Sequence, residues 1–276
     1  MSMNAREYSC KIIEKIWLTP SVMKVRFKPS KPFDFEPGQF LSIYVPVDKP
    51  LVVPGSPKQA AKSPKKGKKT ADKYVRRAYS FACSPETAKK EGYELCVKYL
   101  PDGTGTNYLK SLRVGDSFVA TAPYGDFVFH PLSPDRQVLF ISTGTGIAPF
   151  RSIMTSRMFQ ENPPANALSL FGARTARELL YPNLFESAGV QPVFAVSRPD
   201  KNWTGFNGRV TDYLKTLPRD WPWHQTDFYI CGNGEMITEV HKILTGGHGI
   251  AESSIHKEAF FTNPAAKAAL QEKMSA

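Results

Sequence analysis

The sequence lacks the residue patterns that bind metal ions. Its four cysteines stand far apart, without the CxxC pairs or closely spaced sets that hold zinc or iron–sulfur clusters. Its five histidines include no HExxH motif, which places two zinc ligands one helical turn apart. We therefore expect no metal site. Any redox chemistry would have to be carried by an organic cofactor.

The sequence also lacks long apolar runs and an export signal. Its longest apolar runs, such as residues 138–141, are much shorter than the roughly 20 residues that a helix needs to cross a bilayer. Residues 1–7 contain no apolar segment of the kind found in signal peptides. We expect a protein without a membrane span, located in the cytoplasm, whose cysteines form no disulfide framework.

The length and composition are those of a globular protein with two domains. At about 150 residues per domain, 276 residues suffice for two hydrophobic cores. The local pattern changes near residue 133, where strand-like segments give way to alternating strands and helices. We therefore expect one domain over residues 1–133 and a second over residues 134–276.

Residues 1–133 contain short segments with the alternation and the β-branched content of strands, separated by turn residues. The predicted strands span residues 9–17, 21–28, 39–47, 78–84, 93–100 and 117–122. One predicted helix, residues 107–112, has Thr106 as its N-cap. Six strands at this spacing predict a closed antiparallel β-barrel of Greek-key type.

Residues 134–276 alternate between buried strands and helices. The predicted strands are 137–142, 167–172, 191–197 and 228–231, and the predicted helices are 149–160, 176–186, 210–217 and 235–244. This rhythm predicts an α/β domain with a doubly wound parallel sheet, the usual architecture of nucleotide-binding domains. A helical tail of open role is expected over residues 262–276.

The net charge of +11 is concentrated in one segment. Residues 58–77 hold seven lysines and two arginines against one acid, Asp72, which predicts a basic surface loop over about residues 54–76. Two interpretations stay open: a solubilising insertion, or a docking segment for an acidic partner. We expect no nucleic-acid binding, because no aromatic residues stand between the lysines to stack on bases.

Two glycine-rich turns precede predicted helices, one in each half of the chain. Gly144, Thr145 and Gly146 follow the first parallel strand, and Gly103 to Thr106 precede the helix of the first half. Glycines let backbone N–H groups approach a phosphate, and a helix N-terminus favours its negative charge. Two such turns predict two bound nucleotides.

Arg77 and Tyr79 lie two residues apart on a predicted barrel strand, so alternation places both side chains on one face. An aromatic ring beside a cation suits a planar ring that carries a phosphate. Taken alone, the pair could equally be an exposed cross-strand contact.

Seven motifs occur in the order found in the ferredoxin–NADP⁺ reductase family, which the chain resembles over about residues 8–261. They are Arg77-Ala78-Tyr79-Ser80, Leu95-Cys96-Val97-Lys98, Gly103 to Thr106, Gly144 to Arg151, Ser197-Arg198, Tyr229-Ile230-Cys231-Gly232 and Glu258-Ala259-Phe260. The resemblance implies an FAD-binding barrel, an NADP(H)-binding domain and a flavin-dependent oxidoreductase.

The resemblance also implies roles for individual residues. In the barrel, Tyr79 would stack on the isoalloxazine and Arg77 would bind the FAD pyrophosphate. Ser80 would hydrogen-bond near flavin N5. The other residues implied to contact FAD are Ala78, Cys96, Val97, Lys98, Gly103, Gly105 and Thr106.

In the second domain, the resemblance implies an NADPH site and a catalytic set. The residues implied to bind NADPH are Gly144, Thr145, Gly146, Arg174, Ser197, Arg198, Cys231 and Gly232. Cys231 and Glu258 would line the nicotinamide pocket and, with Ser80, form the catalytic set. NADPH is expected rather than NADH, because Arg174 stands where a carboxylate would read the ribose 2′-OH. Asp200 is the one nearby acid that could favour NADH.

The expected activity is hydride transfer between NADPH and FAD, with single electrons passed to or from a small acidic carrier, ferredoxin or flavodoxin. The carrier would dock near residues 58–76 of a monomer. Two alternatives stay open: the reductase component of an oxygenase or other multicomponent system, and a binding subunit of the same fold that has lost the chemistry.

A charge-neutralising variant tests the docking interpretation of the basic segment. Replacing Lys65, Lys66, Lys68 and Lys69 by Gln should flatten the salt dependence of carrier reduction, because long-range steering weakens as the Debye length shrinks. Stopped-flow rates at increasing ionic strength measure this. An unchanged salt dependence would leave only the solubilising interpretation.

Overall fold

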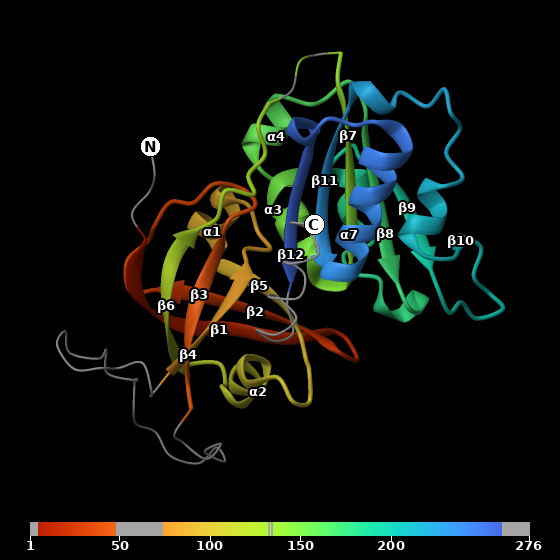
Figure 1. Ribbon diagram of the computed structural model, residues 1–276. Helices are drawn as coiled ribbons and strands as arrows, with labels where there is room; N and C mark the ends of the chain where they lie inside the picture. The colour runs from red at the N-terminus through yellow and green to blue at the C-terminus, as the bar shows by residue number, and fades with distance from the viewer. Residues whose placement is uncertain (1–4, 48–73, 132, 134, 261–276) are drawn as a thin grey trace. The chain divides into compact units, whose positions relative to one another are not determined.

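The computed structural model describes residues 5–47, 74–131, 133 and 135–260. They form two compact units, Met1–Val128 and Phe129–Ala276 (Figure 1). The predicted domain boundary at residue 133 falls in the segment that joins the last strand of the first unit to the first strand of the second. Of the predicted basic loop, residues 54–73 lie outside the described residues, as does the predicted tail.

The first unit contains six described strands in one antiparallel sheet. They are β1 (Arg6–Thr19), β2 (Val22–Pro29), β3 (Phe40–Pro46), β4 (Tyr74–Ser80), β5 (Tyr93–Lys98) and β6 (Ser117–Tyr124). Their order across the sheet is β4-β3-β6-β1-β2-β5. The first strand therefore lies near the middle, with β2 on one side and β6 on the other.

The two outer strands of this sheet, β4 and β5, meet and close a barrel. Directly after β4, Phe81 forms an antiparallel bridge with Leu95 of β5. The Ala82 N–H donates to the Glu94 carbonyl at 2.8 Å. Side chains that alternate along the strands fill the interior, where Phe27 and Phe118 are fully buried with their rings 5.2 Å apart. The predicted antiparallel barrel is confirmed.

Two described helices belong to this unit, α1 (Pro85–Glu91) and α2 (Thr104–Ser111). The prediction that Thr106 caps a helix over residues 107–112 is wrong, because α2 begins at Thr104 with Gly103 in the cap position. The Thr106 hydroxyl instead accepts from the Leu100 N–H at 3.2 Å. It therefore holds the preceding loop against the first turn of the helix.

The second unit contains six described strands in one parallel sheet. They are β7 (Gln137–Thr143), β8 (Ala167–Ala173), β9 (Gln191–Val196), β10 (Phe206–Asn207), β11 (Thr226–Asn233) and β12 (Ile255–Phe260). Their order is β10-β9-β8-β7-β11-β12. From β7 the chain adds β8, β9 and β10 on one side, and then returns to add β11 and β12 on the other side of β7. The direction in which strands are added therefore switches between β7 and β11.

Helices cover both faces of this sheet, which confirms the predicted doubly wound architecture. They are α3 (Ile147–Met154), α4 (Arg157–Glu161), α5 (Leu184–Ser187), α6 (Val210–Leu214) and α7 (Gly234–Lys242). Ile141 of β7 packs with α6 and α7 on one face. The neighbouring Phe140 points to the other face, with its ring 5.0 Å from Phe150 of α3.

Two predicted helices of this unit are interrupted. The helix over residues 149–160 breaks at Ser156, whose extended backbone and side chain cap a separate α4. The prediction of a helix over residues 176–186 is wrong: the structure has only a 3-10 turn and the short α5 there. The segment is interrupted because Tyr181 has φ +51° and Pro182 cannot continue a helix. Among the described residues, no helix is long and apolar enough to cross a membrane.

The turn between β7 and α3 packs directly against β11. Gly144–Gly146 form a single 3-10 turn that leads into α3. A Cβ atom built on Gly146 would lie 2.1 Å from the Cys231 carbonyl oxygen and 2.7 Å from its carbonyl carbon. Only a residue without a side chain allows this approach, because the obstructing atoms are backbone.

Gly146→Ala should therefore destabilise the second unit. The added methyl group must push β7 and β11 apart, and overpacking of this kind costs about 1–3 kcal/mol of unfolding free energy. Gly246→Ala is the matched control, because its Cβ would meet no atom within 4 Å. Urea unfolding measures both variants, and an equal effect would contradict the close approach.

Candidate functional site

In the first unit, the described residues bring Arg77, Tyr79 and Gly105 together. Arg77 and Tyr79 lie opposite Ile43 and Leu41 of β3, on the inward-alternating positions of β4. A Cβ atom on Gly105 would lie 2.6 Å from the Tyr79 hydroxyl and 2.8 Å from Arg77 Cγ. The first turn of α2 thus rests on the Tyr79 and Arg77 side chains, although it lies more than 20 residues further along the chain.

The phenol of Tyr79 stays protonated at neutral pH. Burial raises its pKa above the usual range, although the positive charge of Arg77 acts in the opposite direction. A neutral aromatic ring beside a guanidinium offers a flat apolar surface and a separate anion-binding group.

Gly103 and Thr106 shape the N-terminus of α2. The Asn107 N–H donates to the Gly103 carbonyl at 2.9 Å, and the Asn107 side chain reaches the Pro101 carbonyl at 2.6 Å. These bonds fix the loop that precedes the helix. The N–H groups of a first helical turn lack partners within the helix and can bind an anion.

The remaining first-unit candidates line β4 and β5. Ser80 is buried at the end of β4, whereas the neighbouring Ala78 is exposed. Cys96 and Val97 are buried in β5, so their backbone is better placed than their side chains to contact a ligand. The Lys98 ammonium donates to Ser21 Oγ at 2.7 Å, which directs this side chain toward the turn between β1 and β2.

In the second unit, candidate residues gather where the sheet switches direction. Gly144 has φ +54°, a conformation that favours glycine, and its Cβ would meet no atom within 4 Å. Thr145 follows it in the same turn, and Gly146 packs on Cys231. Open ligand sites in parallel sheets lie at such switch points, beyond the carboxyl ends of the strands.

Cys231 and Glu258 are register partners on β11 and β12. Side chains at paired positions of parallel strands point to the same face of the sheet. Burial raises the pKa of the Cys231 thiol well above its usual value, and the charge of Glu258 raises it further. Cys231 is therefore a neutral thiol rather than a thiolate nucleophile, and Glu258 is the carboxylate paired with it.

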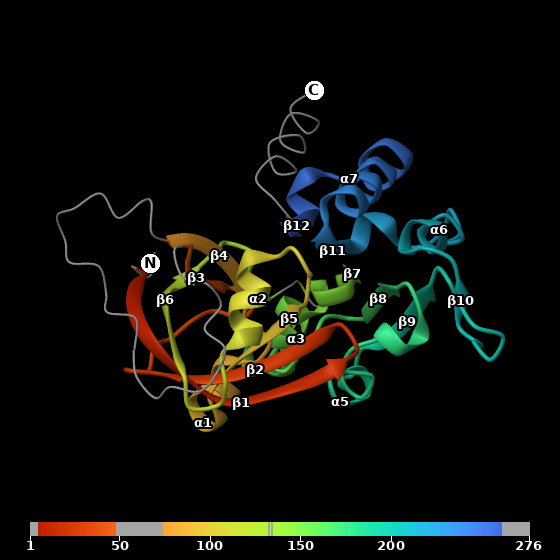
Figure 2. The same cartoon turned by 90° about the horizontal axis from the view of Figure 1, so that it is seen from below.

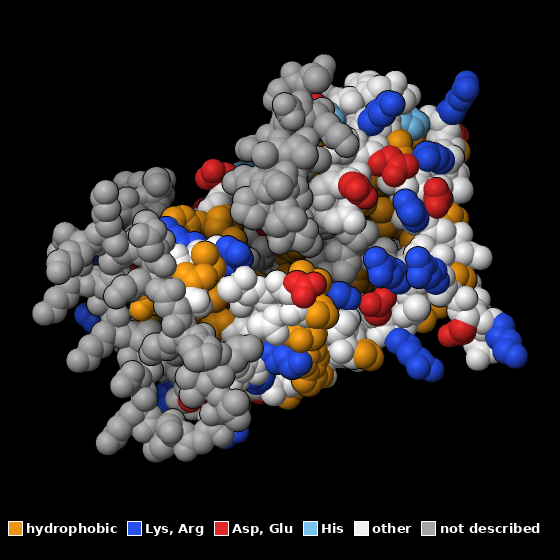
Figure 3. Space-filling model, turned by 60° about the horizontal axis from the view of Figure 1, so that its bottom comes forward, with side chains coloured by type: hydrophobic (Ala, Val, Ile, Leu, Met, Phe, Trp, Pro, Cys, Tyr) orange, Lys and Arg blue, Asp and Glu red, His pale blue; other side chains and the backbone are white. Residues whose placement is uncertain are grey.

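Arg174, Ser197 and Arg198 lie together at the carboxyl ends of β8 and β9. The Arg198 N–H donates to the Arg174 carbonyl at 2.7 Å, and the Ser197 N–H donates to the Ala173 carbonyl at 3.1 Å. All three side chains are exposed. Figure 3 turns the lower side of the second unit forward, where Lys and Arg side chains lie among Asp and Glu side chains.

Sequence reasoning missed Thr143, the last residue of β7. A Cβ atom on Gly232 would lie 2.4 Å from Thr143 Oγ1, so this hydroxyl lies directly over the end of β11. Its position immediately before Gly144 was the available signal. The pairing of β7 with β11, which gives Thr143 this location, has no local signature in the sequence.

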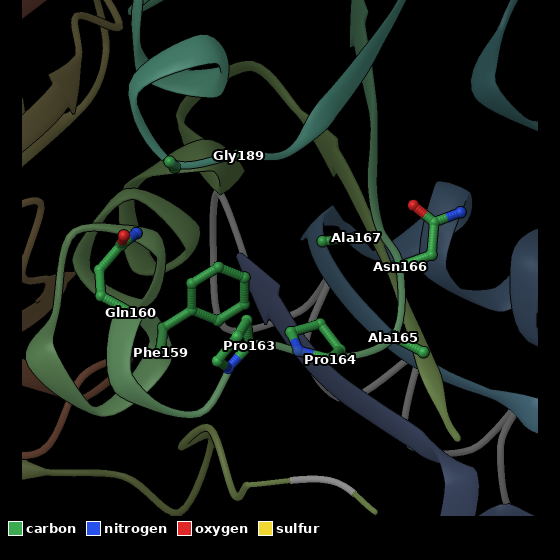
Figure 4. A pocket seen from close by; sticks show the side chains of 9 residues that line it. Phe159, Gln160, Pro163, Pro164, Ala165, Asn166, Ala167 and Gly189 are labelled. Atoms are coloured by element: carbon green, nitrogen blue, oxygen red, sulfur yellow. The ribbon is translucent and has the colours of Figure 1, made fainter. Parts of the chain in front are cut away.

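The opposite end of the strands, where β8 begins, is hollowed. A cavity of about 310 Å³ lies at the start of β8. Figure 4 shows Phe159, Pro163 and Pro164 on one side of it and Gly189 on another. Because none of the predicted site residues lines this cavity, it is separate from the candidate site. Within the described part of the chain, no cluster of residues could hold a metal ion.

These residues fit the two nucleotides that the sequence predicts. In the first unit, Tyr79 offers a ring face, Arg77 a cation, and Gly105 a turn whose N–H groups can approach a pyrophosphate. In the second, Gly144 leaves open space next to the start of α3, and two arginines stand at the neighbouring strand ends. Each unit therefore combines a glycine turn with groups suited to the rest of a nucleotide.

Comparison with known proteins agrees with this geometry. A family model for the oxidoreductase FAD-binding domain matches residues 65–129, and one for the oxidoreductase NAD-binding domain matches residues 140–242. The chain is 26% identical over 269 residues to ferredoxin–NADP reductase B of Sorangium cellulosum, covering 94% of this chain and 99% of that protein.

Two further relatives show the range of similar proteins. The chain is 27% identical to the phenol hydroxylase P5 protein of Acinetobacter pittii, over 93% of this chain and 66% of that protein. A crystal structure of a ferredoxin NADP⁺ reductase from Neisseria gonorrhoeae with bound FAD and NADP shares the fold. Its TM-score is 0.72 at 18% identity, and the match covers 94% of this chain and all of that one.

The two family models, one in each unit, together match more than half of the chain. They describe an FAD-binding and an NAD-binding domain, in agreement with the two nucleotides that the glycine turns predict. The chain belongs to the ferredoxin–NADP⁺ reductase family of flavin oxidoreductases.

Proposed function

We propose that the protein transfers a hydride between NADPH and FAD, and passes single electrons to or from a small acidic carrier, ferredoxin or flavodoxin. The observation that carries this proposal is the pairing of Cys231 with Glu258 beside the Gly144–Gly146 turn. A phosphate-binding turn, a small neutral side chain and an acid–base group then lie at one switch point.

On this proposal, the residues of the first unit bind and orient the flavin. Tyr79 stacks on the isoalloxazine, Arg77 binds the pyrophosphate, and the buried Ser80 hydroxyl holds a hydrogen bond near N5. The backbone of Cys96, Val97 and Lys98, with Gly103, Gly105 and Thr106, completes the site. Bound FAD supplies the chemistry, because it accepts two electrons as a hydride and releases them singly.

The residues of the second unit bind and orient the nicotinamide nucleotide. The N–H groups of the Gly144–Gly146 turn bind its pyrophosphate, and Gly232 keeps the end of β11 free of a side chain. Cys231 leaves room for the nicotinamide ring, and its raised thiol pKa keeps charge away from that ring. Glu258 holds and moves the proton that accompanies hydride transfer.

NADPH is the proposed nucleotide because cations gather where the 2′-phosphate would lie. Arg174 and Arg198 are both exposed and are joined through their backbones. Arg binds phosphate in a bidentate manner, which an uncharged 2′-OH cannot exploit. Asp200, the nearby acid, is also exposed, and its carboxylate accepts a hydrogen bond from the Asn202 N–H at 2.9 Å.

Two observations support an acidic electron carrier. The net charge of +11 is concentrated in residues 58–77, and a basic segment attracts an acidic protein over the Debye length. One relative covered almost completely by this chain is named as a ferredoxin–NADP reductase. Arg76, the last residue of the predicted loop, is already engaged with Ser42 and Tyr124.

A second candidate function is the reductase component of an oxygenase. The similarity to a phenol hydroxylase component supports it, although this chain spans only 66% of that protein. The electron acceptor separates the two candidates, because an oxygenase component would pass its electrons to its own terminal oxygenase. Turnover with ferredoxin or flavodoxin favours the first candidate.

An anaerobic titration tests the proposed function. Adding NADPH to the flavin-loaded protein should bleach the visible flavin absorbance at far lower concentration than NADH, because only NADPH engages the arginines. A protein that binds no flavin would overturn the oxidoreductase activity, and equal responses to both nucleotides would overturn the proposed preference.

The role of Arg198 can be tested separately. Arg198→Ala should weaken NADPH binding by roughly tenfold to a hundredfold, the value of one charge-assisted contact, and leave NADH binding nearly unchanged. Arg157→Ala is the control, because it removes the same charge from the exposed start of α4, whose Phe159 and Gln160 line the cavity at the opposite end of the strands. Dissociation constants from difference spectra measure both. An equal loss for the two nucleotides would contradict the assignment.

A further inference from the structure

Trp17 presents a large aromatic ring to solvent near the end of β1. Its side chain is 46% exposed, whereas Cys10 and Ile12, at earlier inward positions of this strand, are buried. The ring makes an edge contact with Tyr99, with the ring centroids 6.2 Å apart and the planes at 87°. Neither the family motifs nor the proposed mechanism uses this ring.

Tyr99 is held in place from two sides. Its N–H donates to the Ser21 carbonyl at 2.8 Å, which ties it to the turn between β1 and β2. The Lys110 ammonium of α2 lies 4.0 Å from the centroid of the Tyr99 ring. Trp17 therefore rests against a ring that also contacts Lys110 of α2.

The β1–β2 hairpin and α2 are themselves joined. The Lys15 ammonium donates to the carbonyls of Leu109, Lys110 and Leu112 at the C-terminal end of α2, where a positive charge is favourable. Figure 2 shows the hairpin and α2 side by side. Trp17 follows Lys15 by two residues, so alternation places both side chains on the same face of β1.

This aromatic pair adjoins the loop assigned to the FAD pyrophosphate. Leu100, the residue after Tyr99, accepts a hydrogen bond from the Thr106 hydroxyl at 3.1 Å. A Cβ atom on Gly103 would lie 3.0 Å from Leu100 Cβ. Tyr99 is therefore one residue away from direct contact with the first turn of α2.

A dinucleotide extends in two directions from its pyrophosphate. The close approach of Gly105 to Tyr79, the residue assigned to the isoalloxazine, marks the flavin direction. The exposed Trp17 ring beside Tyr99 offers a second planar surface next to the same loop. Adenine stacks well on such surfaces, because it is flat and largely apolar.

We propose that Trp17, supported by Tyr99, is the stacking surface for the adenine of FAD, so that this pair makes the protein prefer FAD to FMN. The inference rests on the proposed flavin site. FMN shares the isoalloxazine and one phosphate with FAD but lacks adenosine, so a contact with adenine affects the binding of FAD alone.

The test compares the binding of two flavins to the full-length chain after its flavin has been removed. Trp17→Ala should weaken FAD binding by about tenfold or more, as removal of one stacking ring does, and leave FMN binding within about twofold. Trp17→Phe keeps a ring and should retain most of the FAD affinity. Quenching of flavin fluorescence on titration gives each dissociation constant.

Ile16→Ala is the matched control. Ile16 is 44% exposed, almost as much as Trp17, but it pairs with Lys24 on the opposite face of β1. Its loss should change neither flavin affinity. Thermal unfolding of each flavin-free variant identifies any general damage to the barrel.

Each other outcome overturns the inference. Equal weakening of FAD and FMN would make Trp17 a structural support of the barrel. Unchanged FAD affinity with slower carrier reduction would make Trp17 part of a protein-docking surface. If the unaltered chain binds FMN as tightly as FAD, this inference fails and the proposed function stands. If it binds neither flavin, both fail.

Discussion

The carbonyl group of Cys231 occupies the space that a side chain on Gly146 would need. That one close approach sets the distance between the turn after β7 and the end of β11, and much of the second unit follows from it. With the turn seated on β11, the start of α3 is fixed at the switch point of the sheet. The same contact leaves Gly144 facing open space, where N–H groups are available to a phosphate.

The first unit also packs a glycine turn against a strand, but through different contacts. Its glycine turn lies at the start of α2, which follows the barrel strand β5, and it packs on side chains rather than on backbone. Gly105 rests on Tyr79 and Arg77, whose own positions are set by pairing with β3. In both units, a glycine brings a turn from one part of the chain onto a strand from another, and the contact is possible only without a side chain.

Much of this architecture could be predicted from local pattern. Strand alternation and turn residues located the six barrel strands, and each glycine turn was visible in the sequence. Edge strands and interrupted helices were harder to predict. The strand β12 was not predicted, because it lies at the edge of the sheet and most of its side chains are only partly buried, so no clear apolar pattern marks it. The pairing of Glu258 with Cys231 depends on that strand and has no local signal.

Helix ends were the least predictable feature, for reasons found in single residues. Tyr181 adopts a positive φ before Pro182, which breaks a segment of good helix formers. Helix α1 was missed because the predicted strand ran on through Ser84, although Ser84 in fact caps that helix by accepting from the Thr87 N–H at 3.2 Å. Such competition between a strand pattern and a cap is decided by the closure of the barrel, where Phe81 pairs with Leu95 of β5. Nothing within residues 78–84 indicates that pairing.

The central place of β1 in the barrel has a consequence for how the protein is made. β1 is the first described strand to leave the ribosome, yet its register with β6 pairs Arg6 with Ala122, and its Lys15 binds carbonyls near the end of α2. Neither partner exists until more than a hundred residues have been synthesised. Contacts between such distant segments form slowly. During synthesis, β1 must therefore avoid aggregation with only β2 as its partner in the sheet. The exposed polar and charged residues Glu7, Ser9 and Lys11 on its outer face suit that interval.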